Sequence, residues 1–151
     1  MKNTDTAGFK GYDAGKKVSG IKRHIAVDTL GLPHAVAVTT AEVTDRMGAL
    51  QALRHCKDTL GQVGSVLVDG GYTGRPFERG VREILGEQVT VQIAKRSELR
   101  AFAVMPKRWI VERSFAWLEK NRRLWKNCER WLNTSLQFVH LAFLALLLRR
   151  S

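Results

Sequence analysis

The 151-residue sequence predicts one α/β domain in which a mixed sheet is flanked by helices. Its length suits a single core, since domains typically hold about 100 to 200 residues. An apolar fraction of 44% and a charged fraction of 26% are typical of globular proteins and argue against a disordered chain. The apolar periodicity changes along the chain in the order β-β-α-β-α-β and then becomes helical only.

The first part of the chain divides into an arm and a hairpin. Residues 1–20 are basic and rich in glycine and show neither apolar period, so we expect an extended or mobile arm outside the core. Residues 21–151 then supply the core and the C-terminal helices. Two strand-like runs, Lys22 to Asp28 and Leu32 to Thr39, are joined by a short turn and predict a β-hairpin.

Helices and strands alternate after the hairpin. A helix is expected from Thr44 to Thr59, with Thr44 as its N-cap and Met47 on the apolar face. The apolar run Val66 to Val68 ends at an acid and two glycines, the profile of a buried strand that stops abruptly. The remaining expected elements are a helix from Pro76 to Leu85, a strand from Thr90 to Ala94, and two long helices between about Lys107 and Arg150 with an interruption at Asn133–Thr134.

The charge balance predicts a polyanionic partner. Lys and Arg number 25 against 14 Asp and Glu, which gives a net charge of +11. Nucleic acid is the commonest polyanion that such a balance attracts. The excess is concentrated in residues 95–130, which hold 11 basic and 4 acidic residues, and this favours a DNA-binding track over an ordinary solvated face.

The sequence carries no feature of secretion or of membrane insertion. The first 20 residues contain no apolar stretch of the length that a signal peptide needs. The longest apolar run, Phe138 to Leu148, is well below the ~20 residues that cross a bilayer. Cys56 and Cys128 are too few for a disulfide scaffold, so we expect buried free thiols and a cytoplasmic location.

Two carboxylates stand out as candidates for chemistry. Asp69 ends the predicted strand before Gly70 and Gly71, which allow a sharp turn and the close approach of a ligand. A single Asp-Gly pair more often only caps a turn. Glu112 lies among apolar residues in RWIVERSFAWLEKNRR, which puts it at the border of the buried helix face. Its ordinary alternative is an i,i+4 ion pair with Arg108.

Four segments in series resemble the C-terminal part of the DDE transposases of the IS5 group of bacterial insertion sequences. They are the basic hairpin GYDAGKKVSGIKRHIAVDTLGLPHAVAV, the strand VLVDGGYTG, the basic strand end AKRS and the helix KRWIVERSFAWLEKNRRL. Together they cover nearly the whole chain in the family's order and spacing. The resemblance implies an RNase H-like fold in which two Asp and one Glu hold two Mg²⁺ ions, with Mn²⁺ as an alternative.

The site residues implied by the resemblance follow position by position. Asp69 matches the second Asp and Glu112 matches the Glu, so both are implied to be catalytic and to bind metal. Arg108 matches the Arg of an Arg-x-x-x-Glu arrangement, whereas Met105 and Glu119 stand where the family has Tyr and Lys. The first Asp has no match. Its strand is central in the RNase H-like sheet, so the predicted fold lacks that strand and both neighbouring strands should expose unpaired edges.

The implied function is Mg²⁺-dependent cleavage and transfer of DNA strands in transposition, with this chain as an N-terminally truncated portion. The implied partners are DNA, as transposon ends and target, and further copies of the chain in an active complex. The implied location is the cytoplasm, and the nucleoid when the protein is bound to DNA. A second hypothesis is an inactive basic DNA-binding remnant that inhibits a full-length transposase. The residues predicted to contact DNA are Lys22, Arg23, Lys95, Arg96, Arg108, Lys120, Arg122 and Arg123.

The four tryptophans have two interpretations. Aromatic side chains within basic segments can stack on unpaired bases. Aromatic residues beside aliphatic residues on a long helix more often belong to the core, and we therefore predict that Trp109, Trp117, Trp125 and Trp131 are structural.

Overall fold

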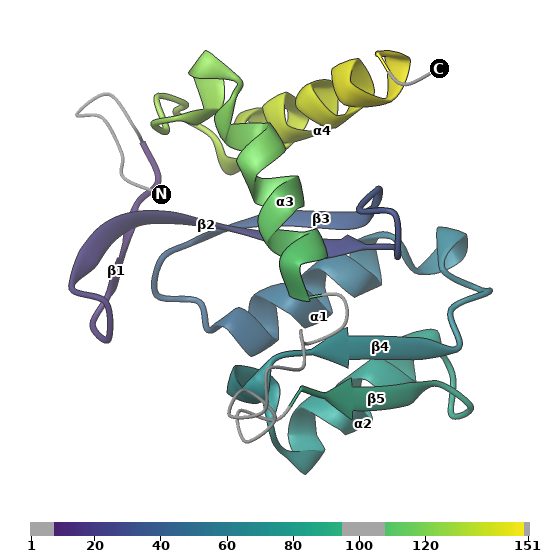
Figure 1. The fold of residues 1–151 in the computed structure, drawn as a ribbon. Coiled ribbons are helices and arrows are strands. Elements are labelled where there is room, and N and C mark those ends of the chain that lie inside the picture. The colour runs from purple at the N-terminus through teal and green to yellow at the C-terminus, as the bar shows by residue number, and fades with distance from the viewer. Residues whose placement is uncertain (1–7, 95–107, 150–151) are drawn as a thin grey trace, which may run out of the picture.

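The computed structural model of the chain describes residues 8–94 and 108–149 (Figure 1). No helix in this part of the chain is long and apolar enough to span a membrane. Within the described residues, three short 3₁₀ turns, η1 (Lys57–Thr59), η2 (Gly70–Tyr72) and η4 (Arg122–Leu124), join the larger elements. Those elements are β1 (Gly11–Asp13), β2 (Val18–Val27), β3 (Pro33–Thr40), α1 (Asp45–His55), β4 (Ser65–Val68), α2 (Arg75–Leu85), β5 (Thr90–Ile93), α3 (Arg108–Glu119) and α4 (Leu132–Leu148).

The strands form two separate sheets. The first has the order β1-β2-β3 and is antiparallel, and β2 and β3 pair from Ile21 opposite Thr40 to Val27 opposite Pro33. The second consists of β4 and β5, which are parallel and joined by α2. The predicted hairpin and the predicted mixed α/β class are thus confirmed.

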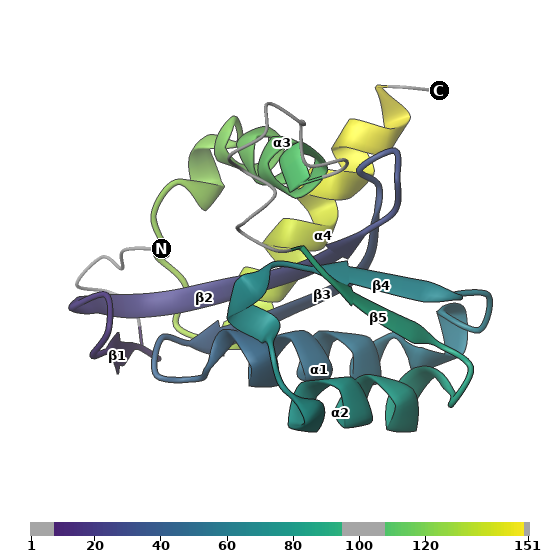
Figure 2. The same ribbon diagram turned by 60° about the horizontal axis from the view of Figure 1, so that its bottom comes forward.

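β3 separates two apolar clusters because its side chains alternate between the two faces of the strand. Ala35 and Ala37 belong to the cluster formed with α1, α2 and β5. Val36 and Val38 belong to the cluster formed with α3, η4 and α4. Figure 2 shows the result, with α1 and α2 side by side below the strands and α3 and α4 above them.

The N-terminal segment differs from the predicted arm. β1 pairs with the first residues of β2, from Gly11 opposite Gly20 to Asp13 opposite Val18. The turn between them places Lys17 at a φ of 52°, and the Asp13 carboxylate accepts a hydrogen bond from the Lys16 amide at 3.0 Å. Residues 11–13 and 18–20 therefore pair within the sheet, where an extended or mobile arm outside the core was expected.

The first helix and the strand β4 differ from prediction in detail. Thr44 caps α1 as expected, since its hydroxyl accepts from the Met47 amide at 3.3 Å. The helix ends at His55, four residues earlier than expected, and Met47 is exposed instead of buried. β4 is not a fully buried strand either, because Leu67 is 45% exposed while its neighbours Val66 and Val68 pack on the core.

The break between the last two helices lies earlier than predicted. α3 ends at Glu119 and α4 begins at Leu132, so Asn133–Thr134 falls inside α4. The Asn121 side-chain amide donates to the backbone oxygens of Trp117 (3.1 Å) and Leu118 (3.3 Å), which satisfies carbonyls that the end of α3 leaves without helical partners. We call residues 120–131, which connect α3 to α4, the linker.

Candidate active site and nucleic-acid surface

Asp69 follows β4 directly and begins the turn η2. One oxygen of its exposed carboxylate accepts a hydrogen bond from the Gly71 amide at 2.9 Å, and its backbone oxygen accepts from the Tyr72 amide at 3.1 Å. Arg46 on α1 donates to the backbone oxygen of Gly71 at 3.0 Å and ties this turn to the helix. Asp69 therefore caps a turn, and the same turn holds its carboxylate at the end of the strand.

Tyr72 anchors the other side of the turn. Its ring packs edge-on against Phe77 of α2, with the ring centroids 5.1 Å apart. Burial raises the pKa of Tyr72 to about 12, and the negative charges of Asp45 and Asp69 act in the same direction. The phenol therefore stays neutral at physiological pH, and the turn that carries Asp69 is fixed to both α1 and α2.

The helix α3, which carries Glu112, is docked on the turn between β2 and β3. The Ser114 hydroxyl, which is fully buried, lies 2.9 Å from the backbone oxygen of Gly31 and 3.0 Å from that of Ile110. Arg113 donates to the backbone oxygen of Leu30 at 2.7 Å. Gly31 has a φ of +84°, and a Cβ there would lie 3.1 to 3.3 Å from α3 side chains. The position of α3 is thus set by contacts that a side chain at residue 31 would disturb.

Glu112 is exposed, so the prediction that it borders the buried face of its helix was wrong. The buried positions of α3 are Ile110, Ser114 and Leu118, which repeat every four residues. Val111, on the other side of the helix, is exposed. The side chain of Arg108, its predicted ion-pair partner, lies outside the described residues.

Asp69 and Glu112 thus lie on separate elements, each exposed and each on a well-anchored backbone. Carboxylate oxygens are the ligands that Mg²⁺ and Mn²⁺ prefer, so the donor type fits these ions. The described residues contain no group of three or more His, Cys, Asp or Glu side chains placed to hold a metal. Asp69 and Glu112 are the two matched positions of the three-carboxylate set that the resemblance implies.

Two of the predicted DNA contacts, Lys22 and Arg23, have partners within the chain. The Lys22 ammonium lies 2.8 Å from the Asp13 carboxylate and 3.4 Å from that of Asp45, and it donates to the backbone oxygen of Val43 at 2.9 Å. Desolvation works against this charge, but the two carboxylates outweigh it and raise the pKa of Lys22. These contacts join β1, β2 and the start of α1.

Arg23 fastens the linker to the sheet. It donates from Nη2 to the backbone oxygen of Leu124 at 2.6 Å, and burial lowers its pKa to about 10, although the charge of Glu119 opposes the shift. Lys95 and Arg96 lie outside the described residues, so the structure gives them no position.

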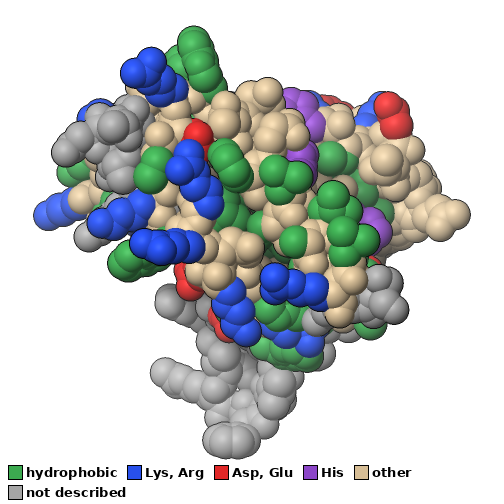
Figure 3. All heavy atoms as spheres, turned by 90° about the horizontal axis from the view of Figure 1, so that it is seen from above, with side chains coloured by type: hydrophobic (Ala, Val, Ile, Leu, Met, Phe, Trp, Pro, Cys, Tyr) green, Lys and Arg blue, Asp and Glu red, His purple; other side chains and the backbone are tan. Residues whose placement is uncertain are grey.

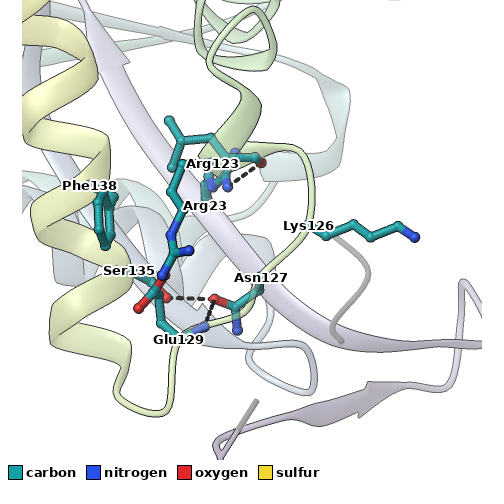
Figure 4. A pocket seen from close by; sticks show the side chains of 8 residues that line it. Arg23, Arg123, Lys126, Asn127, Glu129, Ser135 and Phe138 are labelled. Carbon is teal, nitrogen blue, oxygen red and sulfur yellow. Dashed lines mark hydrogen bonds and ion pairs between the residues drawn. The ribbon is translucent and has the colours of Figure 1, made fainter. Parts of the chain in front are cut away.

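Three further predicted contacts, Lys120, Arg122 and Arg123, are exposed on the linker. Arg123 makes an ion pair with Glu129 at 2.6 Å and lies over the Phe138 ring, and Figure 4 shows Lys126 pointing away from these contacts. Figure 3 shows Lys and Arg side chains gathered on one part of the α3–α4 side of the molecule. The linker surface, as we name it, consists of the exposed residues Lys120, Arg122, Arg123, Trp125, Lys126, Arg130 and Trp131.

The tryptophans correct the sequence prediction. Trp125 is 70% exposed, Trp131 is 64% exposed and Trp109 is also exposed, whereas Trp117 is half-buried. Their core role was predicted from apolar neighbours in a helical pattern, and that pattern does not apply to Trp125 and Trp131, which lie where the chain has left the helix. The density of basic residues around Trp125 was the available indication of a surface position.

Comparison with known proteins supports one family. The sequence model of the family described as "Transposase DDE domain" matches residues 1–148. The chain is 34% identical over 134 residues to a protein of Burkholderia cepacia described as "Putative transposase for insertion sequence element IS402", across 84% of this chain and 60% of that protein. The chain therefore spans less than two thirds of this relative's length. No solved structure matches the chain significantly.

Proposed function

We propose that this chain, which belongs to the transposase DDE domain family, is the C-terminal part of the catalytic domain of an IS5-group transposase. In this proposal the complete domain cleaves DNA strands at transposon ends and transfers them to a target, in the cytoplasm and at the nucleoid. The observation that carries it is that Asp69 lies at the tip of β4, on a turn that Arg46 ties to α1, and that Glu112 lies on α3, which its own Arg113 and Ser114 dock on the β2–β3 turn; both carboxylates are exposed.

A strand that carries the missing carboxylate would complete the site. Among the described residues, residues 22–27 of β2 form their strand pairing with β3, and β4 forms its strand pairing with β5. The opposite edge of each strand is where a further strand would pair. We propose that a strand outside these 151 residues pairs with β2 and β4, joins the two sheets into one RNase H-like sheet and brings the first Asp beside Asp69.

The two carboxylates fit a divalent cation in kind. Bound metal would supply charge stabilisation of the phosphodiester and activation of the attacking oxygen. Asp69 would bind it through the carboxylate at the strand tip, and Glu112 would approach from α3. A second ion would need a further carboxylate, so we place catalysis in the completed domain.

A second candidate function is that of an inactive DNA-binding fragment that inhibits a full-length transposase. The metal-ligand count among the described residues favours it, since only two carboxylates match the triad. Such inhibition requires contact between copies, and we propose that the active complex contains more than one. The exposed Leu141, Leu144 and Leu148 of α4 support this, because they provide uncharged surface on a chain of charge +11.

The test compares the 151-residue chain with a protein extended at its N-terminus by an Asp-bearing strand, on a duplex containing a transposon end and with Mg²⁺. We expect cleavage by the extended protein only. Asp69→Asn should abolish cleavage while keeping the turn, because an amide oxygen can still accept from the Gly71 amide. Glu112→Gln should abolish it as well, with DNA binding retained in both variants.

Matched controls are Asp58→Asn and Glu83→Gln, which change exposed carboxylates on η1 and α2. Both should leave cleavage unchanged. Cleavage by the extended Asp69→Asn protein at the unmodified rate would refute the site. Cleavage by the 151-residue chain alone, retained after Asp69→Asn, would show that another group performs the chemistry.

A further inference from the structure

The linker surface presents a tryptophan to solvent although the backbone around it is firmly held. Trp125 is 70% exposed, but the residue before it, Leu124, and the second residue after it, Asn127, are buried. Leu124 packs with the core cluster, and its backbone oxygen accepts from Arg23. The Asn127 side-chain oxygen accepts from the Ser135 hydroxyl of α4 at 2.7 Å (Figure 4). The exposure of Trp125 therefore comes from a fixed loop conformation.

The charged side chains of the linker are almost all cationic. The linker carries five basic residues and one acid, Glu129, whose carboxylate is already within 2.6 Å of Arg123. The Lys126 ammonium lies 5.5 Å from the centre of the Trp125 ring, so a positive charge is fixed beside the indole. A ligand that contacts both must combine an anionic group with a flat apolar surface a few ångströms away.

An unpaired nucleotide has this chemistry. Its phosphate would be attracted by Lys126 and Arg122, and its base would present a π-face to the indole, an interaction that tolerates any sequence. In an intact duplex the base faces are already stacked, so Trp125 could contact only the backbone. We propose that the part of the linker surface around Trp125 binds unpaired nucleotides at a DNA end, with Trp125 as the stacking platform, Lys126 and Arg122 as the phosphate contacts, and Trp131 outside this site. The proposal deepens the proposed function, since it names the form of DNA that this part of the chain recognises.

Trp131 is the natural control on the same surface. It is as exposed as Trp125, but its ring is in contact with Phe9, with the centroids 5.5 Å apart. The same stretch of chain packs closely there, because a Cβ on Gly8 would lie 2.6 Å from the backbone oxygen of Arg130. Trp131 therefore already has an aromatic partner within the chain. Replacing Trp131 removes an exposed indole but leaves Trp125, the proposed stacking platform, in place.

The experiment measures the affinity of the full chain for three labelled DNAs in EDTA, so that no metal chemistry is involved. The DNAs are a blunt duplex, the same duplex with a short single-stranded 3′ tail, and a single strand of the tail sequence. We expect Trp125→Ala to weaken binding to the tailed duplex and to the single strand by roughly 5- to 150-fold, the range of one base–aromatic stack. Affinity for the blunt duplex should stay within about twofold. Trp125→Phe should restore most of the loss, and Trp131→Ala should change the tailed-to-blunt ratio little.

Several outcomes would overturn the proposal. An equal loss on blunt and tailed duplexes would make Trp125 a general or structural contact, and no loss on any DNA would remove it from the interface. A thermal unfolding curve of Trp125→Ala that matches the parent excludes misfolding as the cause of a loss. Absence of any DNA binding at low salt would refute the DNA partner of the proposed function together with this inference. Blunt-duplex binding without a Trp125-dependent preference for tails would refute this inference alone.

Discussion

The two halves of the molecule pack against opposite faces of β3, but they differ in the exposure of their aromatic rings and in their balance of charged residues. In the α1–β5 segment, residues 41–94, Phe77 is buried and Tyr72 packs on it. In the α3–α4 segment, residues 108–149, Trp109, Trp125 and Trp131 are exposed. The α1–β5 segment holds six basic and seven acidic residues, whereas the α3–α4 segment holds eight basic and three acidic ones. The positive charge of the chain therefore does not come from the α1–β5 segment.

This difference separates two tasks. A segment with balanced charge and covered aromatic rings gains its free energy from burial, so its residues are constrained by packing. A segment that keeps large aromatic rings in water and concentrates positive charge forgoes part of that burial. Exposed aromatic rings and concentrated positive charge suit a surface that binds a separate molecule, and the linker surface combines both features on one loop. We therefore expect mutations in the two segments to affect different measurements.

The largest expected effect is on stability in the α1–β5 segment. Phe77→Ala should lower the free energy of unfolding by about 3–5 kcal/mol, because it removes a buried ring and leaves a cavity. Trp125→Ala removes an even larger side chain from the linker but should cost less than about 1 kcal/mol, mainly the contact with Lys126. Urea unfolding of both variants measures the difference. Similar losses would show that the linker surface is part of the folding core.

A smaller stability effect is expected where α1 crosses β2. Gly48 packs directly on the His24 ring, and a Cβ there would lie 2.1 Å from His24 Nε2. Gly48→Ala should therefore destabilise the chain by about 1–3 kcal/mol through overpacking, since the ring is buried and cannot move aside freely. Gly61, where a Cβ meets nothing within 4 Å, provides the control, and Gly61→Ala should be close to neutral. Equal effects at both positions would show that α1 can shift away from β2.

The α1–β5 segment was also the more predictable half. Its helix cap at Thr44, the strands β4 and β5 and the helix between them follow from local patterns, whereas the parallel pairing of the two strands came from the structure. The end of α1 and the exposure of Leu67 do not, because both depend on what other segments cover. The hairpin of residues 11–20 was missed because its stability comes from pairing and from the Asp13–Lys22 ion pair, not from apolar residues.

The α3–α4 segment was predicted less well for a physical reason. Apolar residues continue through the linker at helical spacing, but the backbone leaves the helix where Asn121 caps it and where Arg23 and Ser135 fix Leu124 and Asn127. Those partners lie on other elements, so no local pattern reveals them. For the site, the positions of Asp69 and Glu112 came from the resemblance, and the importance of Trp125 became apparent only from its exposure.

The charge difference between the halves predicts where DNA binding is sensitive to salt. Lys126→Gln in the linker should reduce the slope of log affinity against log salt by about 1 and weaken duplex binding roughly eightfold at 0.1 M salt, as expected for one lost phosphate contact. Lys57→Gln removes the same charge from an exposed position on η1 and should change neither. The measurement is a salt titration with a random-sequence duplex. An equal change for both variants would mean that only net charge matters.

The smallest expected effect is a pH dependence that originates in the layer between β2 and α1. His24 is buried, its Nε2 lies 2.9 Å from the Thr39 hydroxyl, and desolvation lowers its pKa, with Lys22 and Lys16 adding to the shift and Asp45 opposing it. In the unfolded chain His24 binds a proton at a pKa of about 6.5, whereas in the folded chain it does so only at lower pH. The contribution of His24 to the free energy of unfolding should therefore be complete above about pH 6.5 and decrease below it. Despite desolvation at Asp28, hydrogen bonds lower the pKa values of the Asp13 and Asp28 carboxyl groups, and this affects the free energy of unfolding only in a more acidic range, below about pH 4. Unfolding curves between pH 7.5 and 5 should therefore show a loss that His24→Gln removes, since glutamine can still bond to Thr39 but does not titrate. A loss of the same size in that variant would show that His24 is not the source of the pH dependence.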